Sequence, residues 1–179
     1  MISLQADNRT LTATAPYSYL VSNCSSGIGS FQVVSANLFD VNDFVLIGEW
    51  GSESSEIFKV TAVNETIGEI SITASSTGGS HTHPSTTVYA HPESTKVYII
   101  DYDHINFYWT AAAGTIADET PTFAIGTATV LQADVAIDPT SFYSVYVDSS
   151  NSTGFGWFLF KNSVTSNVST VSNPIPYAG

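Results

Sequence analysis

The chain has 179 residues, of which 43% are hydrophobic and 11% charged, and its four Lys and Arg against 16 Asp and Glu give a formal net charge of −12. Affinity for nucleic acid comes mainly from Lys and Arg that displace counterions from phosphates, so this balance argues against a nucleic-acid partner. The hydrophobic fraction is large enough for folded cores, which excludes a disordered Ser/Thr-rich chain. The length fits one large domain or two small ones.

Cys24 is the only cysteine in the sequence, which excludes an internal disulfide framework and most zinc sites. No potential base stands near it in sequence, so we interpret it as a structural thiol rather than a nucleophile. The N-terminal segment Met1–Asp7 lacks a basic region followed by an apolar run, and no stretch approaches membrane-spanning length. We therefore expect a protein made in the cytoplasm, without an export signal or a membrane partner.

Helical periodicity is nearly absent, whereas alternation of apolar and polar residues recurs between turn-forming residues. In the first half this alternation predicts five short strands: Phe31–Val34, Phe44–Trp50, Glu56–Val63, Glu69–Ala74 and Val97–Ile100. Such strands with tight turns favour a small closed or half-closed barrel over residues 28–100, because a barrel hides its sheet edges. Residues 1–27 are expected to form an N-terminal arm that docks on a neighbouring subunit.

The pattern changes at Asp101, where we place the boundary of a second domain, residues 101–179. The segment His104–Thr110 alternates, which predicts Ile105, Phe107 and Trp109 on a buried face and Asn106 and Tyr108 on the other. Further strands are predicted at Phe123–Leu131, Phe142–Val147, Phe155–Phe160 and Val168–Ser172. This spacing is typical of a compact antiparallel sandwich.

Two parts of this second half resemble fibronectin type III and related immunoglobulin-like domains. Ile105–Thr110 is similar to their tryptophan-bearing B strand, and Gly156–Ser163 followed by Val168–Pro174 is similar to their last two strands. The order and spacing of the three stretches support the resemblance. It implies an immunoglobulin-like β-sandwich for residues 101–179.

A wider resemblance starts at about Phe31. It lies in Asn42–Gly48 with Glu56–Val60, in Val97–Tyr98 followed by Tyr102–Phe107, and in the closing Ser172–Tyr177. These stretches resemble a family of tailed-bacteriophage virion proteins that join a small SH3-like barrel to an immunoglobulin-like domain. The resemblance implies an all-β chain with an SH3-like barrel followed by an immunoglobulin-like sandwich, and a structural component of the virion.

On this reading we expect a non-enzymatic capsid decoration or cement protein, located in the virion and made in the cytoplasm of the host. It would act by multivalent docking, through the barrel or the N-terminal arm, on the major capsid protein or other virion proteins and on copies of itself. Two alternatives stay open. One is a ring component of the neck or tail, and the other is a carbohydrate-binding or adhesin module for the host surface.

The histidines His81, His83 and His91 invite a metal hypothesis, but no cysteine and few carboxylates stand near them in sequence. We expect ordinary solvent-exposed histidines. Asp101 and Asp103 alternate on an extended segment, yet no loop follows that offers the many oxygen ligands calcium needs. An interdomain turn stabilised by aspartate side chains is the favoured interpretation, and no metal ion is expected.

The sequence contains no motif for a nucleophilic serine, a phosphate loop or a zinc protease, so we expect no catalytic residue and no cofactor. Its paired carboxylates, Asp118–Glu119 and Glu53 with Glu56, are predicted to lie in polar turns. A glycosidase would need buried acids held across a cleft.

Aromatic residues carry the carbohydrate-binding alternative, because their rings can stack on sugars. Trp109 and Trp157 alternate with large apolar residues and are predicted to lie in the sandwich core. Trp50 stands at a strand end and is the tryptophan expected to be exposed. With Tyr89 and Tyr98 it completes the set of candidates for an exposed aromatic strip.

Overall fold

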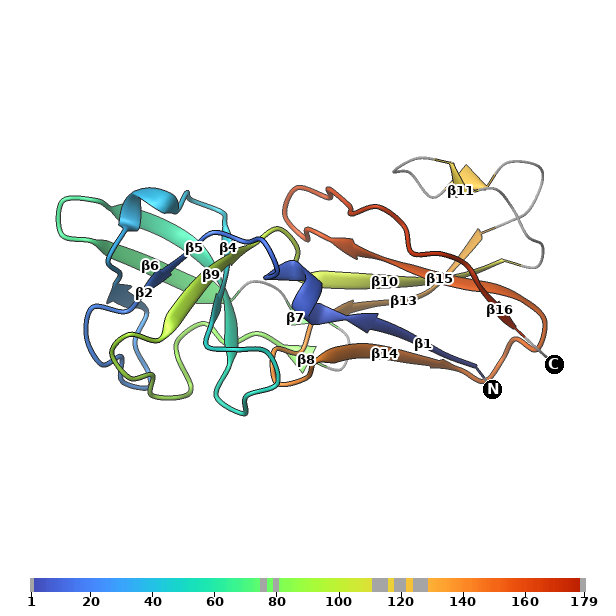
Figure 1. Cartoon of the computed structure of the whole chain (residues 1–179), viewed down its shortest axis with the longest axis horizontal. Coiled ribbons are helices and arrows are strands. Elements are labelled where there is room, and N and C mark those ends of the chain that lie inside the picture. Colours follow the sequence, from blue (N-terminus) through green and yellow to red (C-terminus); the bar gives the residue numbers. More distant parts are fainter. Residues whose placement is uncertain are drawn as a thin grey trace.

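The computed structural model of the chain describes residues 2–74, 77–78, 81–110, 116–117, 122–123 and 129–177. Figure 1 shows an elongated molecule with a curled sheet at one end and a sandwich of sheets at the other. The predicted all-β architecture, a small barrel joined to a sandwich, is confirmed. No helix in the described ranges is both long enough and apolar enough to cross a membrane.

The curled sheet has six antiparallel strands in the order β2-β9-β4-β5-β6-β3. Its two edge strands approach each other, where Leu20 and Val33 form an isolated bridge and the Val34 amide donates to the Tyr19 carbonyl at 2.9 Å. These few bonds link the ends of the sheet and shield its edges. The strands are β2 (Tyr17–Tyr19), β3 (Ser30–Gln32), β4 (Phe44–Ile47), β5 (Glu56–Asn64), β6 (Glu69–Ala74) and β9 (Lys96–Ile100).

The sandwich packs a four-stranded sheet, in the order β13-β10-β15-β16, against a two-stranded sheet of β1 and β14. The rings of Phe107 and Tyr146 stack across the two sheets with centroids 5.6 Å apart. The sandwich strands are β1 (Ile2–Asp7), β10 (His104–Thr110), β13 (Thr129–Ala136), β14 (Tyr143–Asp148), β15 (Gly154–Lys161) and β16 (Ile175–Tyr177). Short ribbons pair β7 (Thr77–Gly78) with β8 (His81–Thr82), and β11 (Ile116–Ala117) with β12 (Thr122–Phe123).

Two 3-10 helices complete the regular structure of the described ranges: η1 (Asn8–Leu11) and η2 (Ala36–Leu38). The Asp7 side chain caps η1 by accepting a hydrogen bond from the Arg9 amide. Because each helix is a single turn, it adds single residues to the cores, such as Ala36 of η2 in the barrel core and Leu11 of η1 against the shared core.

Strand β10 follows the predicted alternation in part. Ile105 and Phe107 are fully buried, and Trp109 is half-buried against the same core. Asn106 lies on the opposite face, as predicted, but it is also buried. It pairs in register with Leu159 of β15, which is buried as well, so both faces of this central strand are covered.

Residues 1–27, expected to form an arm, contribute a strand to each half of the chain. β1 pairs with β14 from Ile2 opposite Asp148 to Asp7 opposite Tyr143, and β2 pairs with β9. Leu4 of β1 is fully buried in the sandwich core. In the structure this segment is therefore paired within its own chain.

One hydrophobic core runs from the barrel into the sandwich, while a second fills the barrel alone. Phe44 and Leu46 of β4 belong to the shared core, and Val45 and Ile47 belong to the barrel core. Because both faces of β4 are buried, its four residues form an unbroken apolar run instead of alternating with polar residues. The shared core joins the two halves by packing rather than by a linker alone.

The C-terminal segment differs from its prediction, because Val168–Ser172 does not form a strand. The Ser169 and Ser172 amides donate to β15 carbonyls at 2.9 Å, as a strand would. The return bonds, however, run from the Phe160 and Phe158 amides to the hydroxyls of these two serines, also at 2.9 Å. Serine hydroxyls thus replace backbone carbonyls along this edge of β15, and regular pairing resumes only at β16.

The turn between β9 and β10 is stabilised by an aspartate side chain, as predicted. The buried carboxylate of Asp103 accepts hydrogen bonds from the Ser163 amide at 2.8 Å and the Ser163 hydroxyl at 2.7 Å. Burial raises the pKa of Asp103, although the bonds from Ser163 act in the opposite direction. Asp103 thereby fastens the start of β10 to the end of β15.

Candidate functional site

The predictions for two of the three tryptophans agree with the structure. Trp157 is fully buried, and its ring stacks on Tyr108 with centroids 4.2 Å apart and planes at 8°. Trp109 packs partly against the shared core, and its indole N–H donates to the Thr153 carbonyl at 2.9 Å. Both residues serve the sandwich rather than an exposed platform.

The prediction that Trp50 is exposed was wrong. Only 6% of its surface is accessible, because the N-terminal segment covers it and the Thr12 hydroxyl accepts a hydrogen bond from its indole N–H at 3.0 Å. Tyr98 is also buried, whereas Tyr89 is exposed. The aromatic strip expected from these three residues is therefore not formed.

The prediction of solvent-exposed histidines was wrong for His83 and His91, which are both buried. His83 Nε2 lies 2.8 Å from the carbonyl oxygen of Ile137, so it links the loop after β8 to the sandwich. His91 Nε2 lies 2.8 Å from a carboxylate oxygen of Glu56. The side chain of His81 lies outside the described residues.

Glu56 begins β5, as the predicted strand Glu56–Val63 requires, but it is buried, so the prediction that it lies with Glu53 in a polar turn was wrong. Its carboxylate accepts hydrogen bonds from the backbone amides of Val88 and Tyr89 at 2.7 and 3.3 Å, in addition to its contact with His91. These partners satisfy the hydrogen-bonding capacity of a buried carboxyl group and hold the loop that follows β8. Glu53, by contrast, is exposed as expected.

Within the described ranges, no three His, Cys, Asp or Glu side chains gather in a way that could hold a metal ion. Cys24 is buried, and burial raises the pKa of its thiol, which suits the structural role predicted for it. The pair Asp118–Glu119 lies outside the described residues.

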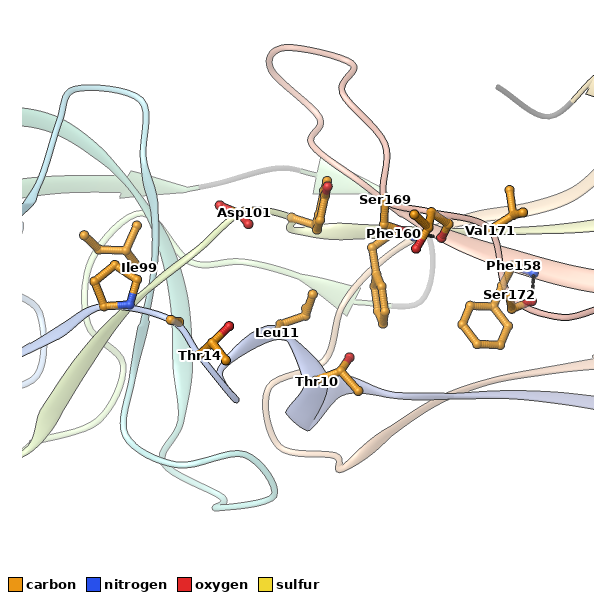
Figure 2. A pocket seen from close by; sticks show the side chains of 14 residues that line it. Thr10, Leu11, Thr14, Ile99, Asp101, Phe158, Phe160, Ser169, Val171 and Ser172 are labelled. Carbon is orange, nitrogen blue, oxygen red and sulfur yellow. Dashed lines mark hydrogen bonds between the residues drawn. The ribbon is translucent and has the colours of Figure 1, made fainter. Parts of the chain in front are cut away.

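A cleft of about 450 Å³ lies where the barrel meets the sandwich. Figure 2 shows Phe158 and Phe160 of β15 pointing toward the segment that carries Thr10 and Leu11. The Thr10 hydroxyl donates to the Asp7 carbonyl, and the hydroxyls of two serines on the opposite wall bond to β15. Because these polar groups already serve the fold, we interpret the cleft as the seam between the two halves.

A different surface is formed by β14 and the residue before it, and is called the β14 face here. It consists of Phe142, Tyr143, Val145 and Val147, whose exposed fractions are 46, 39, 54 and 50%. The opposite side of the same strand carries Ser144, Tyr146 and Asp148, all less exposed. The polarity of β14 is thus inverted, with its valines toward solvent and a buried aspartate toward the protein.

Arg9 closes one end of the β14 face. Its guanidinium carbon lies 5.4 Å from the ring centroids of both Phe142 and Tyr143. It also forms an ion pair with Asp7 at 2.7 Å, and its guanidinium donates to the Tyr143 hydroxyl at 3.1 Å. The hydrogen bonds from Arg9 lower the pKa of Asp7, and the bonds to Asp7 and Tyr143 together hold the arginine beside two aromatic rings.

Two further exposed aromatic residues, Tyr17 and Tyr19, were missed by the sequence analysis. They lie on β2, at the barrel end of Figure 1, in the segment expected to form an arm. The alternation Tyr17-Ser18-Tyr19 was the available signal, since it puts both rings on one side of a strand.

In comparisons with known proteins, no family model, curated protein or solved structure matches this chain.

Proposed function

We propose that this chain is a non-enzymatic structural component of a tailed-bacteriophage virion, and that it decorates the capsid exterior by docking on the major capsid protein. The observation that carries the proposal is the inverted polarity of β14. Exposed apolar patches on soluble proteins mark surfaces that bind other proteins. Docking would occur through the β14 face, which includes residues next to the N-terminal strand β1.

The neighbouring strand shows that the inversion belongs to β14 and not to the sheet as a whole. On β1, Leu4 and Ala6 are fully buried, and Ser3 and Gln5 point to solvent. In register, Ser3 stands opposite Val147 and Gln5 opposite Val145. The valines are therefore bordered by uncharged polar side chains, the composition of an interface core with a polar rim.

Charge also favours this face for docking. The chain carries a net charge of −12, so a second protein of the same sign is repelled over much of its surface. Between Phe142 and Val147 there is no charged residue, and the nearest cation is Arg9. Tyrosine and arginine are the residues that most often supply binding energy in protein interfaces.

The resemblance of Asn42–Gly48 and Glu56–Val60 to tailed-phage virion proteins supports the virion as the location. A decoration protein needs only a modest interface per copy, because copies fixed in a lattice bind with high effective concentration. The shared core connects the two halves by packed apolar side chains, which suits a component of a shell.

The test is to mix the purified chain with capsids that lack it, sediment the capsids and count bound copies against the major capsid subunit. Saturation at a simple ratio to the capsid lattice is the expected result. Absence of binding to capsids, with binding to isolated necks or tails, would replace capsid decoration with the ring alternative. Absence of binding to any virion part would overturn the proposal.

A further inference from the structure

A cluster of aromatic and charged side chains lies on the outside of the barrel, far from β14 along the chain. Strand pairing brings it together, since Tyr17 of β2 stands opposite Tyr98 of β9 and Tyr19 stands opposite Lys96. Glu49, which follows β4, completes the group. We call these five residues the tyrosine cluster.

Ring contacts hold the tyrosines in place. The Tyr17 ring meets the Tyr19 ring edge to face, with centroids 5.5 Å apart and planes at 88°, and it lies 5.4 Å from the Tyr98 ring. Tyr98 is buried, while Tyr17 and Tyr19 keep 43 and 39% of their surface exposed. Tyr17 is thus held on the inner ring of Tyr98, and Tyr19 is held on Tyr17, so little conformational entropy is lost when a ligand covers the two outer rings.

The charged pair supplies hydrogen-bonding groups beside the rings. Lys96 Nζ donates to the Tyr98 hydroxyl at 3.0 Å and lies 3.2 Å from a Glu49 oxygen, and the Tyr98 hydroxyl donates to the Glu49 carboxylate at 3.1 Å. The ammonium group also lies 5.4 Å from the centroids of the Tyr17 and Tyr98 rings. Glu49 keeps 64% of its side-chain surface exposed, so its oxygens can still accept hydrogen bonds.

A shallow hollow continues the surface past Tyr19. Its volume is about 380 Å³, and it is lined by Tyr19, Leu20, Val21, Val34, Glu93 and Ser94. Tyr19 therefore lies between the cluster and the hollow. The cluster includes the carboxylate of Glu49, and the hollow is lined in part by Glu93. An extended ligand of several units can contact the ring and the hollow together.

We propose that the tyrosine cluster, with the hollow beside Tyr19, binds a neutral oligosaccharide. The C–H faces of sugar rings pack on tyrosine rings, and sugar hydroxyls pair with a carboxylate and an ammonium group held at fixed positions. The charges of Lys96 and Glu49 cancel locally, and the net charge of −12 repels anionic glycans. A neutral glycan fits these charges better than a sialylated or sulfated one.

This inference does not depend on the proposed docking function. The tyrosine cluster is on the barrel and the β14 face is on the sandwich, so each can be disabled without changing the other. A virion protein attached through β14 would display many copies of the glycan site, and multivalent display compensates for weak binding at each copy.

The test is a glycan array that holds neutral hexose and N-acetylhexosamine oligosaccharides, together with sialylated and sulfated glycans on the same backbones. The full chain is applied, and every bound glycan is then titrated by NMR with the tyrosine ring signals observed. Binding to neutral glycans with shifts of the Tyr17 and Tyr19 signals is expected. No binding to any glycan, or binding to acidic glycans alone, would overturn the proposal.

Variants distinguish glycan binding at the tyrosine cluster from non-specific binding elsewhere on the protein. Tyr19→Ala and Tyr17→Ala are each expected to weaken glycan binding by about tenfold or more, because each removes a stacking surface. Tyr19→Phe keeps the ring and should retain most of the binding. The matched control is Tyr89→Ala, since Tyr89 is an equally exposed tyrosine elsewhere.

Equal losses for Tyr89→Ala and Tyr19→Ala would overturn the assignment of the site. Capsid sedimentation of the same variants distinguishes the two proposals. Tyr17→Ala and Tyr19→Ala should sediment with capsids as the wild type does, and their circular dichroism spectra should show the wild-type fold.

Discussion

Glu56 and His91 meet inside the protein, with His91 Nε2 2.8 Å from Glu56 Oε2 and both side chains almost fully buried. The same carboxylate accepts the backbone amides of Val88 and Tyr89. One glutamate thus pairs with two backbone amides and one imidazole nitrogen of a loop that lies more than thirty residues later in the chain. This arrangement is structural, because every partner of the carboxylate belongs to the fold.

Replacing Glu56 by Leu leaves His91 and two amides without their acceptor. Since each unsatisfied buried group costs about 1–3 kcal/mol, we expect a loss of about 3 kcal/mol or more in the free energy of unfolding, measured by urea denaturation. Glu53→Gln, three residues earlier and exposed, is the control and should change stability by less than about 0.5 kcal/mol. Equal effects of the two substitutions would contradict the buried role of Glu56.

Gly51 is predicted to resist substitution because of its positive φ and because the Phe142 ring lies against it. Its φ is +79°, and an added Cβ would meet Phe142 ring atoms at 2.6 Å. We expect Gly51→Ala to lower stability by about 2–4 kcal/mol, from backbone strain and from the clash together. Thermal and urea denaturation measure the loss.

Gly27 is a control that distinguishes backbone strain from the steric clash. It has a φ of +82°, but an added Cβ there meets nothing within 4 Å. Gly27→Ala should therefore cost only the strain, about 1–2 kcal/mol. In the double variant of Gly51→Ala with Phe142→Ala the clash is gone, so the two changes should be less than additive by about 1 kcal/mol or more. Strict additivity would show that Phe142 does not press on Gly51.

The raised pKa of Asp103 predicts a pH dependence of stability. A carboxyl group whose pKa is higher in the folded state binds protons more tightly there, so its contribution is present below about pH 3.9 and is lost as the pH rises through the folded-state value. The stability of the wild type minus that of Asp103→Asn should therefore fall as the pH rises above the ordinary pKa of an aspartate, about 3.9. The difference is measured by denaturation at several pH values.

Ser163→Ala gives an independent check of the sign. The Ser163 hydroxyl favours the charged form of Asp103, so its removal should raise the pKa of Asp103 further and extend the fall to higher pH. A difference between wild type and Asp103→Asn that rises with pH, or stays flat, would contradict the burial of a poorly solvated carboxyl group at this turn.

Most strands were predictable because their signals are local. Glu69–Ala74 alternates between turns, and β6 has those bounds. The predicted strand Phe44–Trp50 contains β4, which ends at Ile47, but the burial of β4 on both faces depends on a second core that no local pattern reveals. The prediction of a strand at Val168–Ser172 was wrong for another local reason, because serine hydroxyls replace the backbone acceptors that a strand needs.

Burial of polar residues could not be predicted, because it depends on partners distant in sequence. His83 contacts Ile137 across 54 positions, and Glu56 contacts His91 across 35. Trp50 looked exposed beside Gly51, yet the N-terminal segment covers it. The same long-range pairing, of Tyr17 with Tyr98, assembled the tyrosine cluster.

The measurement that tests the docking proposal most directly is sedimentation with capsids that lack this protein, comparing the wild type with Val145→Lys and Val164→Lys. Both valines are exposed, but only Val145 belongs to the β14 face. We expect saturable binding for the wild type and Val164→Lys, and a loss of binding for Val145→Lys, because a lysine at the centre of an apolar interface is strongly unfavourable. Binding of Val145→Lys equal to that of the wild type would contradict docking through β14.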